Sequence, residues 1–166
     1  MATDKKKSAR RPMLTLTVQR ALAGADRGGA PLRAQLLRWA RAVLLRDVTL
    51  TVRLVGEHEG RALNHSFRGK DAATNVLTFV YGEDASFSAA PLAGDIVLCA
   101  PVVAREAAEQ GKALEAHYAH LLIHGMLHLQ GFDHETQAEA ENMEAHERGI
   151  LRTLGFDDPY QDGDGQ

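Results

Sequence analysis

The sequence Leu114-Glu-Ala-His-Tyr-Ala-His-Leu-Leu-Ile-His-Gly-Met-Leu-His-Leu-Gln-Gly-Phe-Asp-His134 joins a predicted helix to a cluster of histidines. His124 and His128 are four residues apart, so their rings project from one face of that helix, one turn apart. Gly131 can end the helix by adopting a positive φ, and the chain can then turn and bring His134 toward the pair. Three neutral imidazoles around one point predict a metal site with a fourth position left for water, as in catalytic metal centres.

His120, one turn before His124, is a weaker candidate ligand. It lies about 12 Å along the helix from His128 at 1.5 Å per residue, whereas metal–nitrogen bonds measure about 2.0–2.1 Å, so one ion cannot bind both. The spacing alone leaves a pairing of His120 with His124 open. The bend after the helix favours His124 with His128, because it supplies a third ligand. Asp133 in that bend either accepts a hydrogen bond from a ligand ring, which would fix its tautomer, or caps the backbone of the turn.

The spacing is similar to the zinc-binding His-Glu-x-x-His helix of metalloproteases, and to its longer form that ends in Gly-x-x-His. The glutamate of that pattern is the general base, and here its place is taken by Gly125, which cannot accept a proton. A structural zinc site is disfavoured, because such sites are closed by four ligands that usually include cysteines. The chain has one cysteine, Cys99.

Hydrophobic periodicity along the chain predicts an α+β fold. We expect a single four-stranded mixed sheet with helices packed on it and the metal site at the end of a central helix. Alternating or short apolar runs predict strands at 13–19, 48–55, 75–81 and 95–100. Helical spacing predicts helices at 31–46, 57–66, 101–110 and 114–129, and a capping box beginning at Thr136 predicts a last helix that ends near Gly155. Residues 82–92 read as a loop.

Composition is typical of a globular protein, with 45% hydrophobic and 25% charged residues. We expect a single metal-dependent hydrolase domain over residues 13–158, flanked by disordered tails at 1–12 and 159–166. No apolar run reaches the roughly 20 residues that cross a bilayer, and the Lys-rich start lacks the apolar core of a signal peptide. A lone cysteine excludes an internal disulfide, so we expect a cytoplasmic protein.

The net charge of −3 is unevenly distributed. Residues 13–82 carry ten Lys or Arg against five Asp or Glu, whereas residues 135–166 carry two against nine. The basic half predicts either a phosphate-binding face or dispersed, solvated arginines, and composition does not choose between them.

The block from His124 to His134 resembles the signature of the YbeY endoribonucleases, also called rRNA maturation factors. Weaker similarities to this family extend over roughly residues 60 to 160. They are Leu63-Asn-His-Ser-Phe-Arg68, Thr74-Asn-Val-Leu-Thr-Phe79, Gly94-Asp-Ile96 and Gly155-Phe-Asp-Asp-Pro-Tyr160. The second block departs from the family pattern, because Asn75 and Thr78 stand where the family usually has aspartate and serine. That departure puts any role for a carboxylate at position 75 in question.

The resemblance implies a single-domain α+β fold with one bound metal ion, usually zinc. It also implies cleavage of single-stranded RNA, maturation of the 3′ end of 16S rRNA, and ribosome quality control at the small subunit, with no membrane. Arg68 matches the family's functionally important arginine. Imidazole ligands suit several divalent transition metals, so the identity of the ion stays open.

These observations lead to a hypothesis of metal-dependent phosphodiester hydrolysis. His124, His128 and His134 would hold the ion, and Arg68 would pair with the phosphate. Asp95, at the start of a predicted strand, would either contact the metal-bound water or cap the strand. The attacking group, water or the 2′-OH of RNA, stays open. The alternatives are a metalloprotease-like hydrolase and a non-catalytic ribosome assembly factor with a structural metal.

Overall fold

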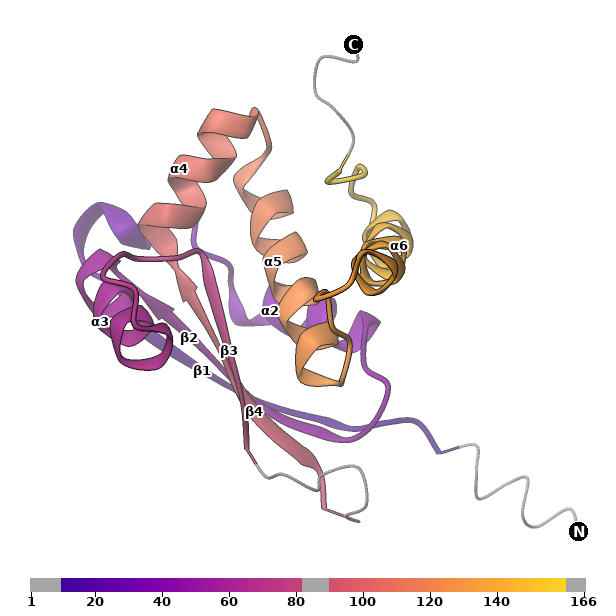
Figure 1. Ribbon diagram of the computed structural model, residues 1–166. Coiled ribbons are helices and arrows are strands. Elements are labelled where there is room, and N and C mark those ends of the chain that lie inside the picture. Colours follow the sequence, from indigo (N-terminus) through magenta and orange to yellow (C-terminus); the bar gives the residue numbers. More distant parts are fainter. Residues whose placement is uncertain (1–9, 82–89, 161–166) are drawn as a thin grey trace, which may run out of the picture.

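In the computed structural model, which describes residues 10–81 and 90–160, a four-stranded mixed sheet lies between helices (Figure 1). The strands are β1 (Leu14–Ala21), β2 (Val48–Val55), β3 (Val76–Tyr81) and β4 (Leu92–Cys99). Their spatial order is β1-β2-β4-β3. The first three in that order are parallel, whereas β3 pairs antiparallel with β4 at the edge. The predicted α+β class and mixed sheet are confirmed.

Helices cover both faces of this sheet (Figure 1). They are α2 (Arg33–Ala42), α3 (Glu57–Arg68), α4 (Ala100–Gln110), α5 (Leu114–Leu129) and α6 (Gln137–Thr153), with a short 3-10 helix η1 (Gly24–Arg27). α3 lies on one side of the sheet, while α2 and α5 lie on the other, and α6 packs on the outer side of α5. α5 is therefore the central helix, enclosed by the sheet, α2, α4 and α6.

Alternation along β4 divides the core in two, because successive strand residues face opposite sides. Ile96 faces α5 and belongs to the larger cluster, which includes Trp39 of α2 and Met143 of α6. Val97 and Cys99 face the other side and belong to a smaller cluster. Its other members, from β2, α3, β3 and α4, include Val55, Leu63, Leu77, Phe79 and Val102.

The sheet and α5 approach each other closely at two glycines. A Cβ atom on Gly94 of β4 would lie 2.2 Å from Leu129 Cδ1 and 2.6 Å from the carbonyl oxygen of Phe79. A Cβ atom on Gly125 of α5 would lie 3.1 Å from Ile96 Cδ1. These contacts seat the C-terminal half of α5, which carries the candidate ligands, directly on β3 and β4.

Two predicted boundaries are wrong by more than two residues, and a third is wrong by two. The helix expected to reach residue 46 ends at Ala42, because the amide of Gln130 donates to Val43 O and its oxygen accepts from Leu45 N. The strand expected at 95–100 begins at Leu92 and gives way to α4 at Ala100. The helix expected to end at 66 continues for two residues to its αL cap at Gly69. The other predicted elements agree with the structure to within two residues.

The ends of the described chain pack on its body. Arg10, which we placed in the N-terminal tail, forms an ion pair with Asp47 at 2.7 Å. Pro159 O accepts a hydrogen bond from Lys112, and Tyr160 reaches the buried Glu147, so the folded part extends to Tyr160. The rest of both predicted tails, and most of the expected 82–92 loop, lie outside the described residues. Within the described ranges, no helix is long and apolar enough to span a membrane.

Candidate metal centre

The last turns of α5 and the bend after it bring the three predicted histidines together. Gly131 adopts a φ of +113°, as predicted, and the backbone N–H of Phe132 bonds to Leu127 O. The ring centroid of His134 lies 5.5 Å from that of His124 and 5.8 Å from that of His128. With bonds of about 2.0–2.1 Å, imidazoles around one tetrahedral ion have centroids about 5 Å apart. The observed separations are close to that value.

Two of these rings have one nitrogen held by an acceptor, which leaves the other free. His124 Nδ1 lies 2.6 Å from Glu147 Oε2, and His128 Nδ1 lies 3.2 Å from the carbonyl oxygen of Phe132. Metal-binding histidines are typically oriented by such acceptors. The donor chemistry therefore fits an ion held through the Nε2 atoms. In the part of the chain that the structure describes, however, no three His, Cys, Asp or Glu side chains are arranged to hold an ion. The metal site stays a prediction.

Glu147 is the most buried charged group beside this cluster. Its side chain is 0% exposed, and it accepts hydrogen bonds from His124, His120 and the hydroxyl of Tyr160. Burial alone would raise the pKa of Glu147, but these three hydrogen bonds outweigh it and lower the pKa to about 2. Burial and the bond to Glu147 raise the pKa of Tyr160. The carboxylate is therefore ionised and the phenol neutral at physiological pH.

Glu147 was not among the residues predicted from the sequence, although its spacing in the sequence was a signal. Met143, Glu147 and Leu151 are spaced at i, i+4 and i+8, which places the glutamate on the same buried face of α6 as two core residues. A carboxylate at such a position needs hydrogen-bond donors. The histidines of α5 supply two of them. His120, the weaker candidate ligand, thus bonds to Glu147 rather than facing the cluster.

A cleft of about 150 Å³ opens between α6 and the histidines. It is lined by His124, His134, Ala140, Met143, Glu144, Glu147 and Tyr160. The side chain of His124 is 29% exposed, and His128 and His134 are exposed. A small ligand can therefore reach these rings from solvent.

Gly125 points away from this cleft, toward the sheet. It is buried, and a Cβ atom there would lie 3.2 Å from Thr78 Oγ1 and 3.1 Å from Ile96 Cδ1. The side chain of a glutamate at this position, as in zinc proteases, would press on Thr78 and Ile96 of the sheet and would not face the cleft. The missing base is thus a consequence of how α5 packs on β3 and β4.

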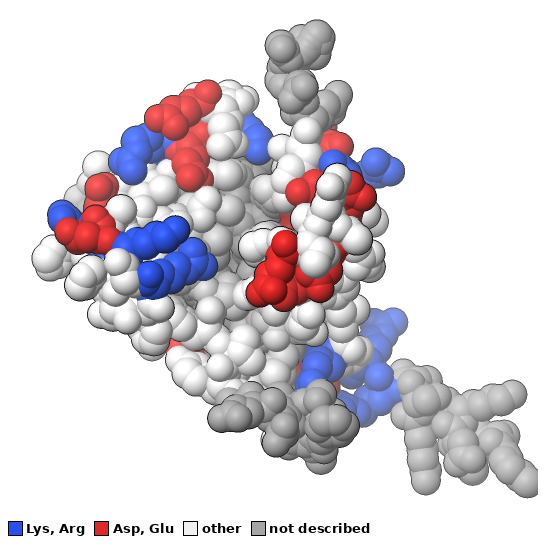
Figure 2. Space-filling view, viewed as in Figure 1, with Lys and Arg blue, Asp and Glu red and all other residues white. Residues whose placement is uncertain are grey.

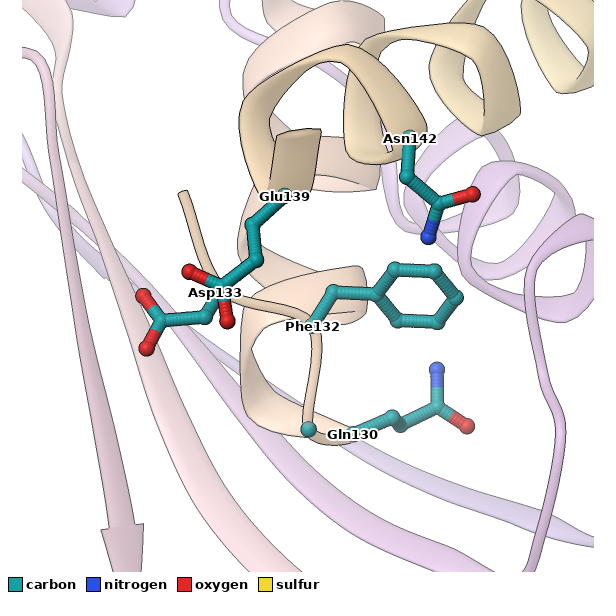
Figure 3. A pocket seen from close by; sticks show the side chains of 6 residues that line it. Gln130, Phe132, Asp133, Glu139 and Asn142 are labelled. Atoms are coloured by element: carbon teal, nitrogen blue, oxygen red, sulfur yellow. The ribbon is translucent and has the colours of Figure 1, made fainter. Parts of the chain in front are cut away.

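The outer side of the bend forms a second pocket of about 340 Å³ (Figure 3). Figure 3 shows Asp133 and Glu139 on one side, with the ring of Phe132 pointing away from them, between Asn142 and Gln130. Asp133 Oδ1 accepts from the backbone N–H of His134 at 2.7 Å, so Asp133 caps the turn, one of its two predicted roles. Both charged groups of this pocket are carboxylates, which repel phosphate.

Arg68 and Asp95 come from α3 and β4, not from the helix and bend that carry the histidines. Arg68 is the exposed last residue of α3, and the neighbouring Phe67 packs on Phe79 of β3 with centroids 4.4 Å apart. Asp95 pairs with Phe79 across the strands, so its side chain lies on the α3 face of the sheet, opposite α5. Its carboxylate accepts a hydrogen bond from Tyr81 at 2.5 Å. The structure does not bring Asp95 to the three histidines.

Asn75, which stands where the family usually has aspartate, has a partner that suits an amide. Its Nδ2 donates to Glu106 Oε1 at 2.9 Å, and the same oxygen lies 2.9 Å from His117 Nε2. Burial lowers the pKa of His117, although its bond to Glu106 opposes this effect. The group links the start of β3 to α4 and α5.

Charge is divided across the face that carries the cluster. Figure 2 shows Lys and Arg side chains together with Asp and Glu side chains over the α3 side, and Asp and Glu side chains gathered on the α6 side. The basic residues of α3 and the turn after it are Arg61, Arg68 and Lys70. Arg61 is paired with Asp71 at 2.6 Å. A polyanion approaching this face would be repelled more by the α6 side than by the α3 side.

Comparison with known proteins gives the family. The family model described as endoribonuclease YbeY matches residues 32–155. The chain is 64% identical over 156 residues to an endoribonuclease YbeY of Azoarcus sp., covering 92% of this chain and 62% of that protein. It is 63% identical to the endoribonuclease YbeY of Aromatoleum aromaticum, covering 89% of this chain and 92% of that one. The chain thus spans less than two thirds of the first relative but nearly all of the second.

A solution structure of TM1509 from Thermotoga maritima is also similar, with a TM-score of 0.49 and 27% sequence identity over 90% of this chain and 99% of that one. The family model and the two relatives cover the histidine block, α3 and the sheet strands β2 to β4. The resemblance inferred from the histidine block is confirmed. This chain belongs to the YbeY family of endoribonucleases.

Proposed function

We propose that this protein is a metal-dependent endoribonuclease that cleaves single-stranded RNA and matures the 3′ end of 16S rRNA in the cytoplasm. The observation that carries the proposal is the cluster of His124, His128 and His134, in which two rings are anchored through Nδ1 and adjoin the third. Family membership supplies the reaction class. We place the work of this domain in rRNA maturation and quality control of the small ribosomal subunit.

The three histidines would hold the ion, for which zinc is the first choice because imidazole is among its usual ligands. When bound, such an ion supplies Lewis acidity and lowers the pKa of a coordinated water. The chain's part is to keep Nε2 of His124 and His128 free and unprotonated, which the acceptors on their Nδ1 atoms do. The cleft beside them leaves His124 and His134 open to a ligand.

Arg68 is the residue we propose for the phosphate itself. Its guanidinium is permanently charged and matches two phosphate oxygens with its planar fork. Phe67, next to it, is fixed on Phe79, so the end of α3 has a defined position. Asp95 is a weaker candidate than Arg68, because its carboxylate already accepts a hydrogen bond from Tyr81.

The two alternatives are less well supported. A protease of the zinc-helix type needs a glutamate where Gly125 packs against Ile96 and Thr78. A purely structural metal would brace groups that the fold otherwise leaves loose, yet α5 is already held by a continuous apolar core. Chelation should therefore remove activity without unfolding the protein.

The central experiment compares metal content and RNA cleavage in the wild type and His128→Ala. His128 is exposed, so its truncation should leave the fold intact. We expect the wild type to bind about one ion per chain and to cleave single-stranded but not duplex RNA, and the variant to lose both properties. His58→Ala, which removes an exposed histidine of α3, is the matched control. Metal-free wild-type protein with full activity would contradict the proposal.

A second experiment isolates the arginine. Arg68→Ala should lower turnover while the metal stays bound, because Arg68 is not among the proposed ligands. Arg61→Ala removes the same charge from the same helix, but that charge is already paired with Asp71. Equal turnover in the two variants would remove Arg68 from the mechanism. Product ends decide the nucleophile, since a 2′,3′-cyclic phosphate would identify the 2′-OH and exclude direct attack by water.

A further inference from the structure

Glu147 is the acceptor on His124 Nδ1, and it is also the hub of the most buried polar network beside the cluster. Oε2 accepts from His124 Nδ1 at 2.6 Å, and Oε1 accepts from His120 Nε2 at 2.9 Å and from the hydroxyl of Tyr160. The side chain is completely buried. An ionised carboxylate can only accept hydrogen bonds. Every group that faces it must therefore donate.

This requirement sets the tautomers of two histidines. His124 must carry its proton on Nδ1, which leaves Nε2 as the nitrogen with a free lone pair. His120 must carry its proton on Nε2, so the nitrogen that faces the carboxylate cannot bind an ion. Its other nitrogen, Nδ1, is buried and has no hydrogen-bond partner among the described residues. The hydrogen bond to Glu147 thus argues against the pairing of His120 with His124 that the spacing left open.

The carboxylate is itself held from the far side. Tyr160 packs its ring edge-on against His120, with centroids 5.1 Å apart, and its hydroxyl lies 3.0 Å from His120 Nε2. Arg148 lies over the Tyr160 ring at 5.2 Å from its centroid. Groups from α5, α6 and the segment after α6 therefore fix Glu147, and Glu147 fixes the ring of His124.

We propose that Glu147 is a positioning residue that locks His124 in its Nδ1–H tautomer, with His120 and Tyr160 holding Glu147 in place. This inference rests on the proposed function only in taking His124 as a metal ligand. Acceptors on metal-binding histidines orient the ring and increase its basicity, and their removal typically costs about 10- to 100-fold in metal affinity or activity.

The first test needs no metal. Two-bond ¹H–¹⁵N spectra of the metal-free wild type report the tautomer of each ring, with His124 and His120 assigned by the signals lost in His124→Asn and His120→Asn. We expect opposite tautomers four residues apart, Nδ1–H at His124 and Nε2–H at His120. A His124 ring protonated on Nε2 overturns the inference, whatever the protein's activity.

The second test measures Zn²⁺ affinity by competition with a coloured chelator. Glu147→Gln keeps the size of the side chain but offers one acceptor oxygen in place of two, so it cannot accept from both histidines. We expect Zn²⁺ binding about 10- to 100-fold weaker. Glu144→Gln is the matched control, because Glu144 lines the same cleft but is half-buried and pairs with Arg148 at 3.7 Å. Its Zn²⁺ affinity should change by less than about twofold, as expected for a screened surface charge.

The Zn²⁺ affinities of the two variants can overturn the inference in two ways. Unchanged affinity in Glu147→Gln, or equal losses in both variants, overturns the inference, since equal losses would reflect charge rather than the hydrogen bond. Urea unfolding of each variant separates loss of the site from loss of the fold, and if Glu147→Gln does not fold, the wild-type tautomers decide. A wild type that binds no Zn²⁺ contradicts the proposed function, while the tautomer spectra still test the inference.

Discussion

Gly94→Ala should destabilise the protein, because the added methyl group has no space. The new Cβ would lie 2.2 Å from Leu129 Cδ1 and 2.6 Å from the carbonyl oxygen of Phe79. Leu129 can yield by changing rotamer, but the carbonyl belongs to the backbone of β3, which pairs with β4 along its whole length. The strand or the helix must therefore shift.

The expected magnitude follows from two opposing effects. Overpacking a well-packed core costs about 1–3 kcal/mol, and a backbone clash belongs at the upper end. Replacing glycine by alanine restricts the unfolded chain and returns about 0.4–1 kcal/mol. We expect a net loss of about 2 kcal/mol, which for a chain of this size lowers the Tm by about 4–8 °C.

Urea unfolding followed by fluorescence of Trp39 measures this loss, because Trp39 is the single tryptophan and is fully buried. Gly149→Ala is the matched control. Gly149 lies within α6, and a Cβ atom there meets nothing within 4 Å. Alanine is favoured over glycine within a helix, so this variant should gain about 0.5–1 kcal/mol. A Gly94→Ala protein as stable as the wild type would refute the close-packing argument.

Three further predictions concern the polar groups that join the elements. Asn75→Asp places a second carboxylate against Glu106, which should lower the free energy of unfolding by about 1–3 kcal/mol at pH 7. The loss should be smaller at pH 5, because one of the two carboxyl groups then binds a proton. Urea unfolding midpoints at pH 7 and pH 5 test this prediction. Burial holds the pKa of His117 below its usual 6.5, so the unfolded chain binds a proton that the folded chain does not, and the free energy of unfolding should fall as the pH drops through 6.5. His117→Gln should weaken this dependence of the free energy of unfolding on pH, and an unchanged dependence would contradict the assignment to His117. Thr136→Ala removes the side-chain oxygen that accepts from Glu139 N at the start of α6 and should lower the stability by about 0.5–2 kcal/mol, measured by thermal unfolding. Thr136→Ser keeps a hydroxyl at this position and should retain most of that stability.

Periodicity predicted most of the fold because the elements with strong patterns are also the ones that pack. The strand Val48–Val55 and the helix Leu114–Leu129 were predicted to the residue, since the first alternates strictly and the second is apolar on nearly all sides. The end of α2 could not be predicted, because it depends on Gln130, a side chain from 85 residues further along the chain. Tertiary hydrogen bonds of this kind leave no local pattern.

In the candidate site too, local features could be predicted from the sequence and tertiary contacts could not. The spacing of His124, His128 and His134 is a local property, so sequence alone could place the three rings side by side. The acceptor on His124 comes from α6, and its identity depends on how two helices pack. The surroundings of Asp95 could not be predicted for a related reason. Its position beside Gly94 is visible in the sequence, but the side of the sheet on which it lies depends on the pairing of β4 with β3.

The packing of α5 on the sheet also sets the direction in which the candidate ligands point. Successive residues of an α-helix are 100° apart, so positions four apart form a stripe along it. Gly125 and Leu129 form the stripe that contacts β3 and β4, and His124 and His128 form the adjacent stripe, one residue earlier. A close contact at the first stripe therefore fixes the rotation of the helix and with it the second stripe. Gly94→Ala, by pushing on Leu129, should weaken Zn²⁺ binding as well as stability, although it changes no ligand and no hydrogen bond to one.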